Sequence, residues 1–384
     1  MSGDIYIAGF SVACALGMDN AAVAANLFAA TPPRIGDTAQ LGDGRAVPVG
    51  RLPGALDGAE GATRTNRIVA HCLAPLRDTI AAAKARYGSE RVGVVIGTST
   101  SGIGEGGAAL AEKLERGQFP ATFSLAHQQL GDSARFAALL CGLTGPYYVV
   151  STACTSGARA LAAGARLIRA GMCDAVVCGG ADSLCDLTLN GFAALDSLSD
   201  AACNPMSVNR KGLNLGEGGA LFLLTRHEGP FRLAGCGESV DGHHMSAPDP
   251  EGKGAEAAMR GALTMAGVAR DGVDFAHLHG TATRLNDQME AAVVERVLGL
   301  ETPCASTKAL TGHTLGAAGA VQAALCLMAM QRGRLPPHVW DGERDPELAQ
   351  IRLSAPGERA PLKRILSASY AFGGNNAALL LAAA

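Results

Sequence analysis

One cysteine, Cys154, stands where a thiol could act as a nucleophile. It follows the apolar run 147–150, which predicts a strand, and it precedes the small-residue stretch 158–170, which predicts a helix. Unpaired N–H groups and the positive end of the dipole at a helix N-terminus favour thiolate over thiol. The small neighbours at 155–158 would let a substrate carbonyl approach the sulfur. Position alone does not separate this function from a cysteine that only packs at a helix start.

Two of the nine histidines occupy comparable places. His279 follows the strand-like run 275–278, and His313 opens the apolar helix predicted at 316–330. Sites are commonly built at such ends of strands and helices. With a poised thiol, two imidazoles make a catalytic set plausible. Lys308 precedes His313 by five residues, and the alternative for it is a solvated loop lysine.

The composition limits the classes of protein to consider. The chain has 384 residues, 48% of them hydrophobic and 17% charged, which predicts two or three domains with ample buried core. Aromatic residues make up only 4%, and 32 basic against 35 acidic residues give a net charge of -3. Nucleic-acid binding needs a basic footprint, so the composition argues against it.

The eleven cysteines indicate a reducing compartment rather than a disulfide framework. No CxxC pair occurs, and the cluster Cys173, Cys178 and Cys185 fits no common zinc spacing, so no metal is expected. The N-terminus lacks the basic region of a signal peptide. The most apolar stretch, 315–330, is interrupted by Gln322 and predicts a buried core helix rather than a membrane span. We therefore expect a cytoplasmic protein.

Strand-like runs alternate with helical segments throughout the chain. Such alternation predicts an α/β fold whose sheets are covered on both faces. A strand–helix unit around Cys154 is echoed around His313, and a glycine turn precedes a late apolar strand in each half, at 216–220 and 372–377. The echo suggests two similar halves that join near Arg226. The predicted strands are 92–97, 147–150, 175–180, 220–224 and 377–381.

Four segments, spread from about residue 4 to residue 382, resemble the β-ketoacyl-acyl carrier protein synthases. These are the Cys-His-His condensing enzymes of fatty acid and polyketide synthesis. The order and separation of the segments match the family, which makes the resemblance far more specific than a single glycine-rich match. The segments are Ser-Thr-Ala-Cys-Thr-Ser-Gly at 151–157, His-Gly-Thr-Ala-Thr at 279–283 with Asn286, Asp287 and Glu290, the run 306–319 from Ser-Thr-Lys to Gly-Ala-Ala-Gly, and Ala-Phe-Gly-Gly-Asn-Asn-Ala at 371–377.

The resemblance implies the thiolase fold, an α/β fold of two pseudo-symmetric βαβαβαββ halves in an α/β/α/β/α layered arrangement. Residues 1–226 would form the half that carries the nucleophile, and residues 227–384 the half that carries both histidines. The resemblance also implies acyl carrier protein as partner, and a homodimer or a heterodimer with a related synthase subunit.

The resemblance further implies the reaction, a decarboxylative Claisen condensation of an acyl thioester with malonyl-acyl carrier protein. Cys154 would accept the acyl group, because a thiolate suits exchange between thioesters. His279 and His313 would flank the malonyl thioester carbonyl and stabilise the enolate formed when CO₂ leaves. No metal and no other cofactor is required.

Four further residues receive roles from the resemblance. Lys308 would supply positive charge beside His313, with Glu290 as its partner. Phe372 would stand at the gate of the acyl pocket together with Phe192. The backbone N–H of Phe372 would form an oxyanion hole with that of Cys154.

Three relatives with the same fold are alternatives. A thiolase would need a second catalytic cysteine near the C-terminus, but the last cysteine is Cys326 in the apolar helix. An initiating synthase would carry asparagine where His313 stands. A chain-length factor, the non-catalytic subunit of a condensing heterodimer, generally lacks the nucleophile. The presence of Cys154 with both histidines favours catalysis.

The chain departs from the family at several positions. Asp196 stands where a basic residue for carrier-protein docking is common, and 204–207 reads Asn-Pro-Met-Ser in place of the common Arg-Pro-Phe-Asp. These departures suggest a specialised pathway, such as a polyene or another secondary metabolite. Arg64 and Arg67, at the start of the helix predicted at 68–84, resemble positions that face the acidic carrier protein. The alternative for both is an ordinary solvated helix face.

Overall fold

The computed structural model describes residues 3–56 and 61–384 of the chain. The elements of the first half are β1 (Tyr6–Ala13), α1 (Asn20–Leu27), β2 (Asp37–Gln40), β3 (Ala46–Val49), α2 (Arg64–Leu73), α3 (Arg77–Tyr87), β4 (Val92–Gly97), α4 (Ile103–Arg116), α5 (Asp132–Cys141), β5 (Tyr147–Val150), α6 (Ser156–Arg169), β6 (Ala175–Asp182), α7 (Asp186–Ala194) and β7 (Gly218–Thr225). Those of the second half are β8 (Phe231–Val240), α8 (Lys253–Ala266), β9 (Phe275–His277), α9 (Arg284–Leu298), β10 (Cys304–Ala305), α10 (Lys308–Thr311), α11 (Ala318–Arg332), β11 (Arg364–Tyr370) and β12 (Asn375–Ala383).

Ten of the strands form one mixed sheet in the order β10-β9-β11-β12-β8-β1-β7-β6-β4-β5. Outwards from the junction of β8 with β1, the first half has the order β1-β7-β6-β4-β5 and the second half β8-β12-β11-β9-β10. If the sheet strands of each half are numbered along the chain, both halves have the order first, fifth, fourth, second, third. The last strand of each half, β7 or β12, is antiparallel to both of its neighbours, and the remaining strand pairs within each half are parallel. The junction is short and antiparallel, with Tyr6 opposite Arg232 and Ile7 opposite Phe231. The repeat predicted from the sequence echo is therefore present in the topology.

The predicted join lies in the connection between β7 and β8, which covers residues 226–230. Because the two halves share one continuous sheet, the division into residues 1–226 and 227–384 stays a prediction.

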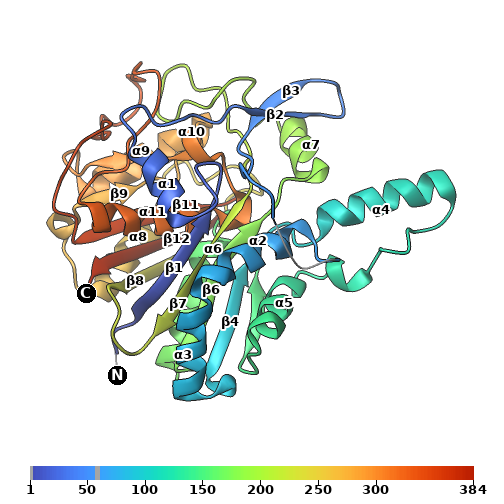
Figure 1. Ribbon diagram of the computed structural model, residues 1–384. Coiled ribbons are helices and arrows are strands. Elements are labelled where there is room, and N and C mark those ends of the chain that lie inside the picture. Colours follow the sequence, from blue (N-terminus) through green and yellow to red (C-terminus); the bar gives the residue numbers. More distant parts are fainter. Residues whose placement is uncertain (1–2, 57–60) are drawn as a thin grey trace.

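The central layer consists of α6 and α11, which pack against each other between the two halves of the sheet (Figure 1). A Cβ atom at Gly157 of α6 would lie 2.9 Å from the backbone nitrogen of Ala320, and one at Gly319 of α11 would lie 2.9 Å from that of Ala158. Only glycine allows this approach, because any side chain would overlap the opposing backbone. The small residues after Cys154 and His313 thus bring the starts of the two helices together.

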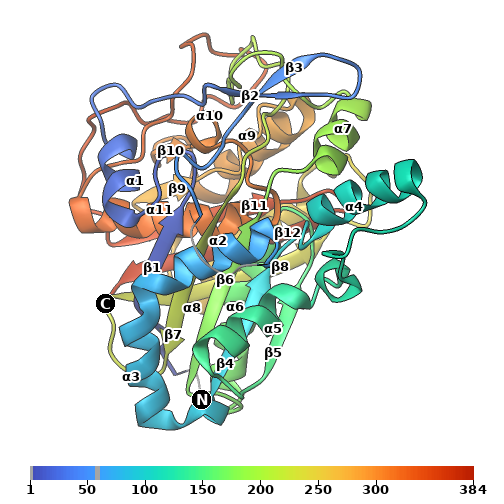
Figure 2. The ribbon, with the colours of Figure 1, turned by 45° about the vertical axis from the view of Figure 1, so that its right-hand side comes forward.

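The outer layers cover the remaining faces of the sheet. Helices α2 and α5 contact the strands of the first half, and α8 contacts β8 and β12 of the second half, with α9 beside it. Helix α4 extends away from the sheet (Figure 2). Among the described residues, no helix combines the length and apolar character needed to cross a lipid bilayer.

One predicted helix is wrong as a continuous element. The stretch predicted at 68–84 is divided into α2 and α3 by a short 3₁₀ segment, Ala74–Leu76. Pro75 causes the break, since proline lacks an N–H donor and its ring collides with the preceding turn.

Candidate active site

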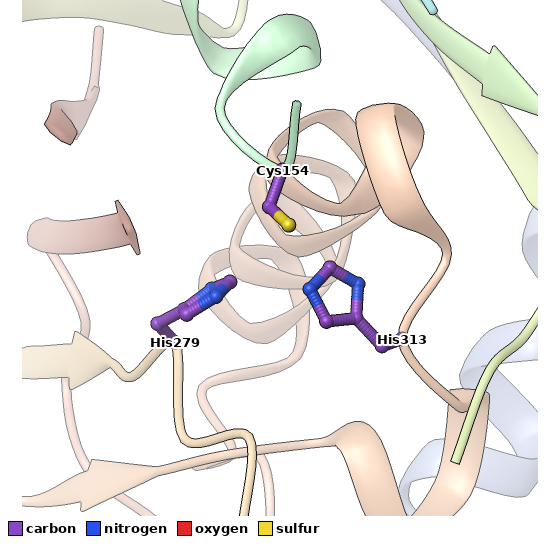
Figure 3. A group of neighbouring side chains, drawn as sticks. All are labelled: Cys154, His279 and His313. Carbon is purple, nitrogen blue, oxygen red and sulfur yellow. The ribbon is translucent and has the colours of Figure 1, made fainter. Parts of the chain in front are cut away.

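Cys154, His279 and His313 converge although they are far apart in the sequence (Figure 3). One sulfur or nitrogen atom from each side chain lies within 4.8 Å of those of the other two. The two imidazole ring centres are 5.2 Å apart and the rings are nearly perpendicular, at 87°. All three residues are buried. The structure therefore brings together the three groups singled out in the sequence.

Cys154 is held in a tight turn between β5 and α6. Ala153 has a positive φ of 51°, a conformation that costs energy for a residue with a side chain. Ser156 secures the turn, because its hydroxyl donates to the Ala153 carbonyl at 2.6 Å and accepts from the Thr152 N–H at 2.9 Å. The strained backbone thus places the thiol two residues before Ser156, the first residue of α6.

Burial raises the pKa of the Cys154 thiol to about 11, despite the opposing effect of nearby Lys308. The helix N-terminus was expected to favour the thiolate, but desolvation outweighs it and the net shift of the pKa is upward. The backbone N–H groups of Cys154 and Phe372 both act to lower the pKa of the thiol, and so favour the thiolate. These two amides converge near the sulfur, as the donors of an oxyanion hole must.

The raised pKa predicts how Cys154 reacts with a small alkylating reagent. Only the thiolate is the nucleophile, and below the pKa its fraction rises tenfold per pH unit. We expect the rate of Cys154 modification by iodoacetamide to rise about tenfold per unit between about pH 7 and pH 9. Peptide mass spectrometry with a Cys154→Ala control assigns the signal. A rate that levels off below about pH 8 would contradict the buried, neutral thiol.

His279 lies just beyond the end of β9. The Glu290 carboxylate of α9 fixes this segment, because it accepts the backbone N–H groups of His279 and Gly280, both at 2.6 Å. The Lys308 Nζ lies 3.4 Å from the Nδ1 of His279 and also donates to its carbonyl oxygen. Since an ammonium only donates, Nδ1 is the accepting nitrogen and Nε2 carries the proton.

His313 is positioned by its own backbone turn. Its N–H donates to the Asn214 carbonyl at 2.7 Å, and its carbonyl accepts from the Gly216 N–H at 2.9 Å. Its Nδ1 accepts the N–H of Leu315 at 3.1 Å. An N–H donor at Nδ1 leaves Nε2 as the protonated nitrogen, so this ring too is a donor through Nε2.

Burial, reinforced by the charge of Lys308, holds the pKa of both His279 and His313 well below the ordinary value. Both rings are therefore neutral N–H donors at physiological pH. A metal ion would need the other tautomer, with the lone pair on Nε2 free to bind the metal and the proton on Nδ1. The hydrogen bonds at both Nδ1 atoms fit oxyanion stabilisation and do not fit metal ligation.

Lys308 begins α10 and is completely enclosed. The predicted partnership with Glu290 is not a direct ion pair: both Glu290 oxygens accept backbone N–H groups, and the Lys308 ammonium contacts His279 and, at 3.4 Å, the Oε1 of Gln322. Lys308 thus contacts His279 directly, and its charge also acts on His313. Burial lowers the pKa of Lys308 and raises that of Glu290, and the charge of each partly opposes the shift of the other.

A cavity of about 260 Å³ opens onto the three groups. Phe192 of α7 and Phe372 of the β11–β12 connection line it and stack on each other, with ring centres 5.4 Å apart. The role of this pair as a gate stays a prediction. Arg284 and Leu285 at the start of α9 line the same cavity and are exposed to solvent, so they lie at its mouth.

The predicted docking residues lie outside the lining of this cavity. The Arg64 guanidinium forms an ion pair with the buried Glu217 carboxylate, with Nε 2.7 Å from Oε2. Arg67, one turn further along α2, is half-buried. Because Glu217 already balances the charge of Arg64, that residue is the weaker docking candidate. Carrier-protein docking at Arg64 and Arg67 stays a prediction.

Two buried residues at the site were missed by the sequence interpretation. Gln322 of α11 contacts Lys308 and the ring of His277, and it donates to the Ala368 carbonyl at 2.9 Å. Asp182 is the last residue of β6 and lies close enough to Cys154 for its charge to raise the pKa of the thiol. An acidic residue that ends an otherwise apolar strand was the available signal for Asp182.

Comparison with protein families identifies the chain's relatives. The family described as "Beta-ketoacyl synthase, N-terminal domain" matches residues 58–229, and "Beta-ketoacyl synthase, C-terminal domain" matches residues 231–340. The tetracenomycin polyketide synthase ketoacyl synthase alpha subunit of Streptomyces glaucescens is 34% identical over 320 residues, 76% of this chain and 75% of that protein. The 3-oxoacyl-[acyl-carrier-protein] synthase 2 of Rhizobium meliloti is 33% identical over 311 residues, 75% of this chain and 73% of that one.

Solved structures support the same assignment. A ketosynthase (ApeO) in complex with its chain length factor (ApeC) from Xenorhabdus doucetiae matches with a TM-score of 0.94 and 39% identity, covering 100% of this chain and 98% of the other. The thiolase fold predicted from the resemblance is thereby confirmed. The chain belongs to the β-ketoacyl synthase family of the thiolase superfamily.

Proposed function

We propose that this chain elongates carrier-bound acyl groups by decarboxylative Claisen condensation, with Cys154 as acyl carrier and His279 and His313 as oxyanion donors. The chain is an acyltransferase of the 3-oxoacyl-[acyl-carrier-protein] synthase type. The observation that supports these roles best is the convergence of one thiol and two neutral imidazole N–H donors on a single cavity.

The first step is exchange between thioesters. The Cys154 sulfur attacks the acyl carbonyl, and the resulting oxyanion is stabilised by the N–H groups of Cys154 and Phe372. The bond from the acyl carbon to the carrier sulfur then breaks. The proton of the thiol leaves with that sulfur, so the exchange is neutral overall and leaves the acyl group on Cys154.

The second step uses the two histidines. Loss of CO₂ breaks a C–C bond of the malonyl thioester and leaves its electron pair as an enolate, whose oxygen accepts from Nε2–H of His279 and of His313. The enolate carbon attacks the acyl carbonyl on Cys154, and the C–S bond breaks. The released thiolate takes a proton from solvent, as the pKa of about 11 requires.

The partners follow from the relatives and from the exposed surface. Carrier-bound substrates agree with a cavity whose mouth reaches solvent at Arg284. Strand β5 is an edge of the sheet, and its residue Tyr147 is exposed, as are Leu139 and Leu140 of the adjacent helix α5. An apolar open edge of this kind favours strand pairing with a partner. We propose that a second subunit of the same fold covers it, either another copy or a chain length factor like that of the similar ketosynthase.

The alternative function is a non-catalytic subunit of such a pair. Both imidazoles carry their proton on Nε2 and so act as donors, which favours catalysis, because an idle site would not need two Nε2–H groups beside a thiol.

The eleven cysteines are all free, and a cytoplasmic location is proposed on that basis.

A product assay tests the proposed function. The purified chain, alone and with a partner subunit, is given acyl- and malonyl-loaded carrier proteins, and products are identified by mass. We expect CO₂ release and a product two carbons longer, with dimers in sedimentation. A chain that makes no elongated product with any acyl length or partner would contradict the proposal.

A further inference from the structure

Asp182 lies between the two halves of the molecule and is completely buried. Its carboxylate accepts five groups: the hydroxyls of Thr98 and Thr100 at 2.5 and 2.8 Å, the N–H groups of Ser99 and Thr100, both at 2.9 Å, and the N–H of Gly316 at 2.6 Å. The first four donors follow β4 in the first half, and Gly316 precedes α11 in the second. One side chain therefore joins segments from both halves.

The donor from the second half belongs to the turn that orients His313. Leu315 donates its N–H to Nδ1 of His313, and the next N–H, that of Gly316, points to Asp182. Leu315 has a positive φ of 50°, so the turn needs external support. A Cβ atom at Gly316 would lie 2.7 Å from the Asp182 carboxylate, so glycine is required for this approach.

The contacts of Asp182 favour an anion and oppose the burial that raises the pKa of its carboxyl. Every partner is an N–H or hydroxyl group that donates to it, and the five hydrogen bonds replace the water removed by burial. An asparagine has nearly the same shape, but its NH₂ group would face backbone N–H donors. The turn could then no longer keep both the Leu315 N–H bond to His313 and the Gly316 N–H bond to residue 182.

We propose that Asp182 is a positioning residue for His313: it anchors the turn at Gly316 and thereby fixes the Nε2–H of His313 towards the substrate oxygen. Asp182 touches neither substrate nor reacting atom in this role. The inference rests on the proposed function of His313, and it assigns the support of that ring to a residue of the other half.

The test combines kinetics with nitrogen NMR. Asp182→Asn should lower decarboxylation of a malonyl thioester about tenfold or more in the wild-type background, but less than about twofold in a His313→Ala background, because both changes remove the same interaction. In histidine-labelled protein, the His313 signal of the Nε2–H tautomer should shift or broaden in Asp182→Asn.

The matched control is Asp132→Asn. Asp132 is also buried and hydrogen-bonded, to Asn66 and Arg135 on the outer side of the first half. Asp132→Asn should lower the melting temperature of the protein without changing the His313 signal. Independent, multiplicative losses in the double variant, or an unchanged His313 signal in Asp182→Asn, would overturn the proposal. The NMR result decides it even if the wild-type chain proves inactive, which would instead contradict the proposed function.

Discussion

Replacing either His279 or His313 by alanine should lower the decarboxylation rate of a malonyl thioester by about 10²–10³-fold. Each ring supplies one preorganised N–H donor to the enolate oxygen, and such a donor contributes on the order of 3 kcal/mol. The two losses should be less than multiplicative, because the rings share one oxygen. Release of labelled CO₂, measured without an acyl substrate, isolates this step.

Asparagine at position 313 refines this prediction. Its amide can still donate a hydrogen bond, so His313→Asn should keep more activity than His313→Ala. His71→Ala is a control, because this half-buried ring bonds to the Met18 carbonyl away from the cavity. Equal activity of the wild-type protein and the two alanine variants at the site would contradict the assignment of the rings as donors.

Cys154→Ala should abolish condensation while leaving decarboxylation largely intact. The substitution removes the only atom proposed to hold the acyl group, so no covalent intermediate can form. His279 and His313 keep their positions, since their hydrogen bonds to Lys308 and Leu315 do not involve the thiol. The enolate then has no acyl carbonyl to attack and takes a proton, giving an acetyl thioester.

Cys185 is the matched cysteine for this experiment. It is also buried and stands at the N-terminus of a helix, α7, where its thiol shares a hydrogen bond with the Thr188 hydroxyl. Cys185→Ala should keep both activities. Condensation that survives Cys154→Ala, or decarboxylation that disappears with it, would show that the two steps are not divided as proposed.

The sequence predicted much of the fold because its signals are local. The apolar runs that became β4, β5 and β6 are visible without knowledge of the tertiary structure, and the echo around Cys154 and His313 predicted the repeat. The break at Pro75 could also have been predicted, since a proline inside a helical pattern interrupts it. The family membership and the thiolase fold predicted from the motifs are confirmed.

The details of the site depend on burial and contact, which the sequence does not show. The helix-end argument for Cys154 was physically sound, but burial reversed the direction of the pKa shift. The family resemblance implied Glu290 as the partner of Lys308, whereas the folded chain uses Glu290 to bind backbone N–H groups. Asp182 joins two halves of the chain, and no local pattern predicts the five donors that meet there.

The most direct test of the central claim is the site of acylation. The purified chain is mixed with an acyl-loaded carrier protein, digested, and each cysteine-containing peptide is weighed. The account predicts one acyl group, on the peptide that carries Cys154, and its release when malonyl-carrier protein is added. An acyl group on another cysteine, or an adduct at Cys154 that malonyl-carrier protein leaves in place, would contradict it.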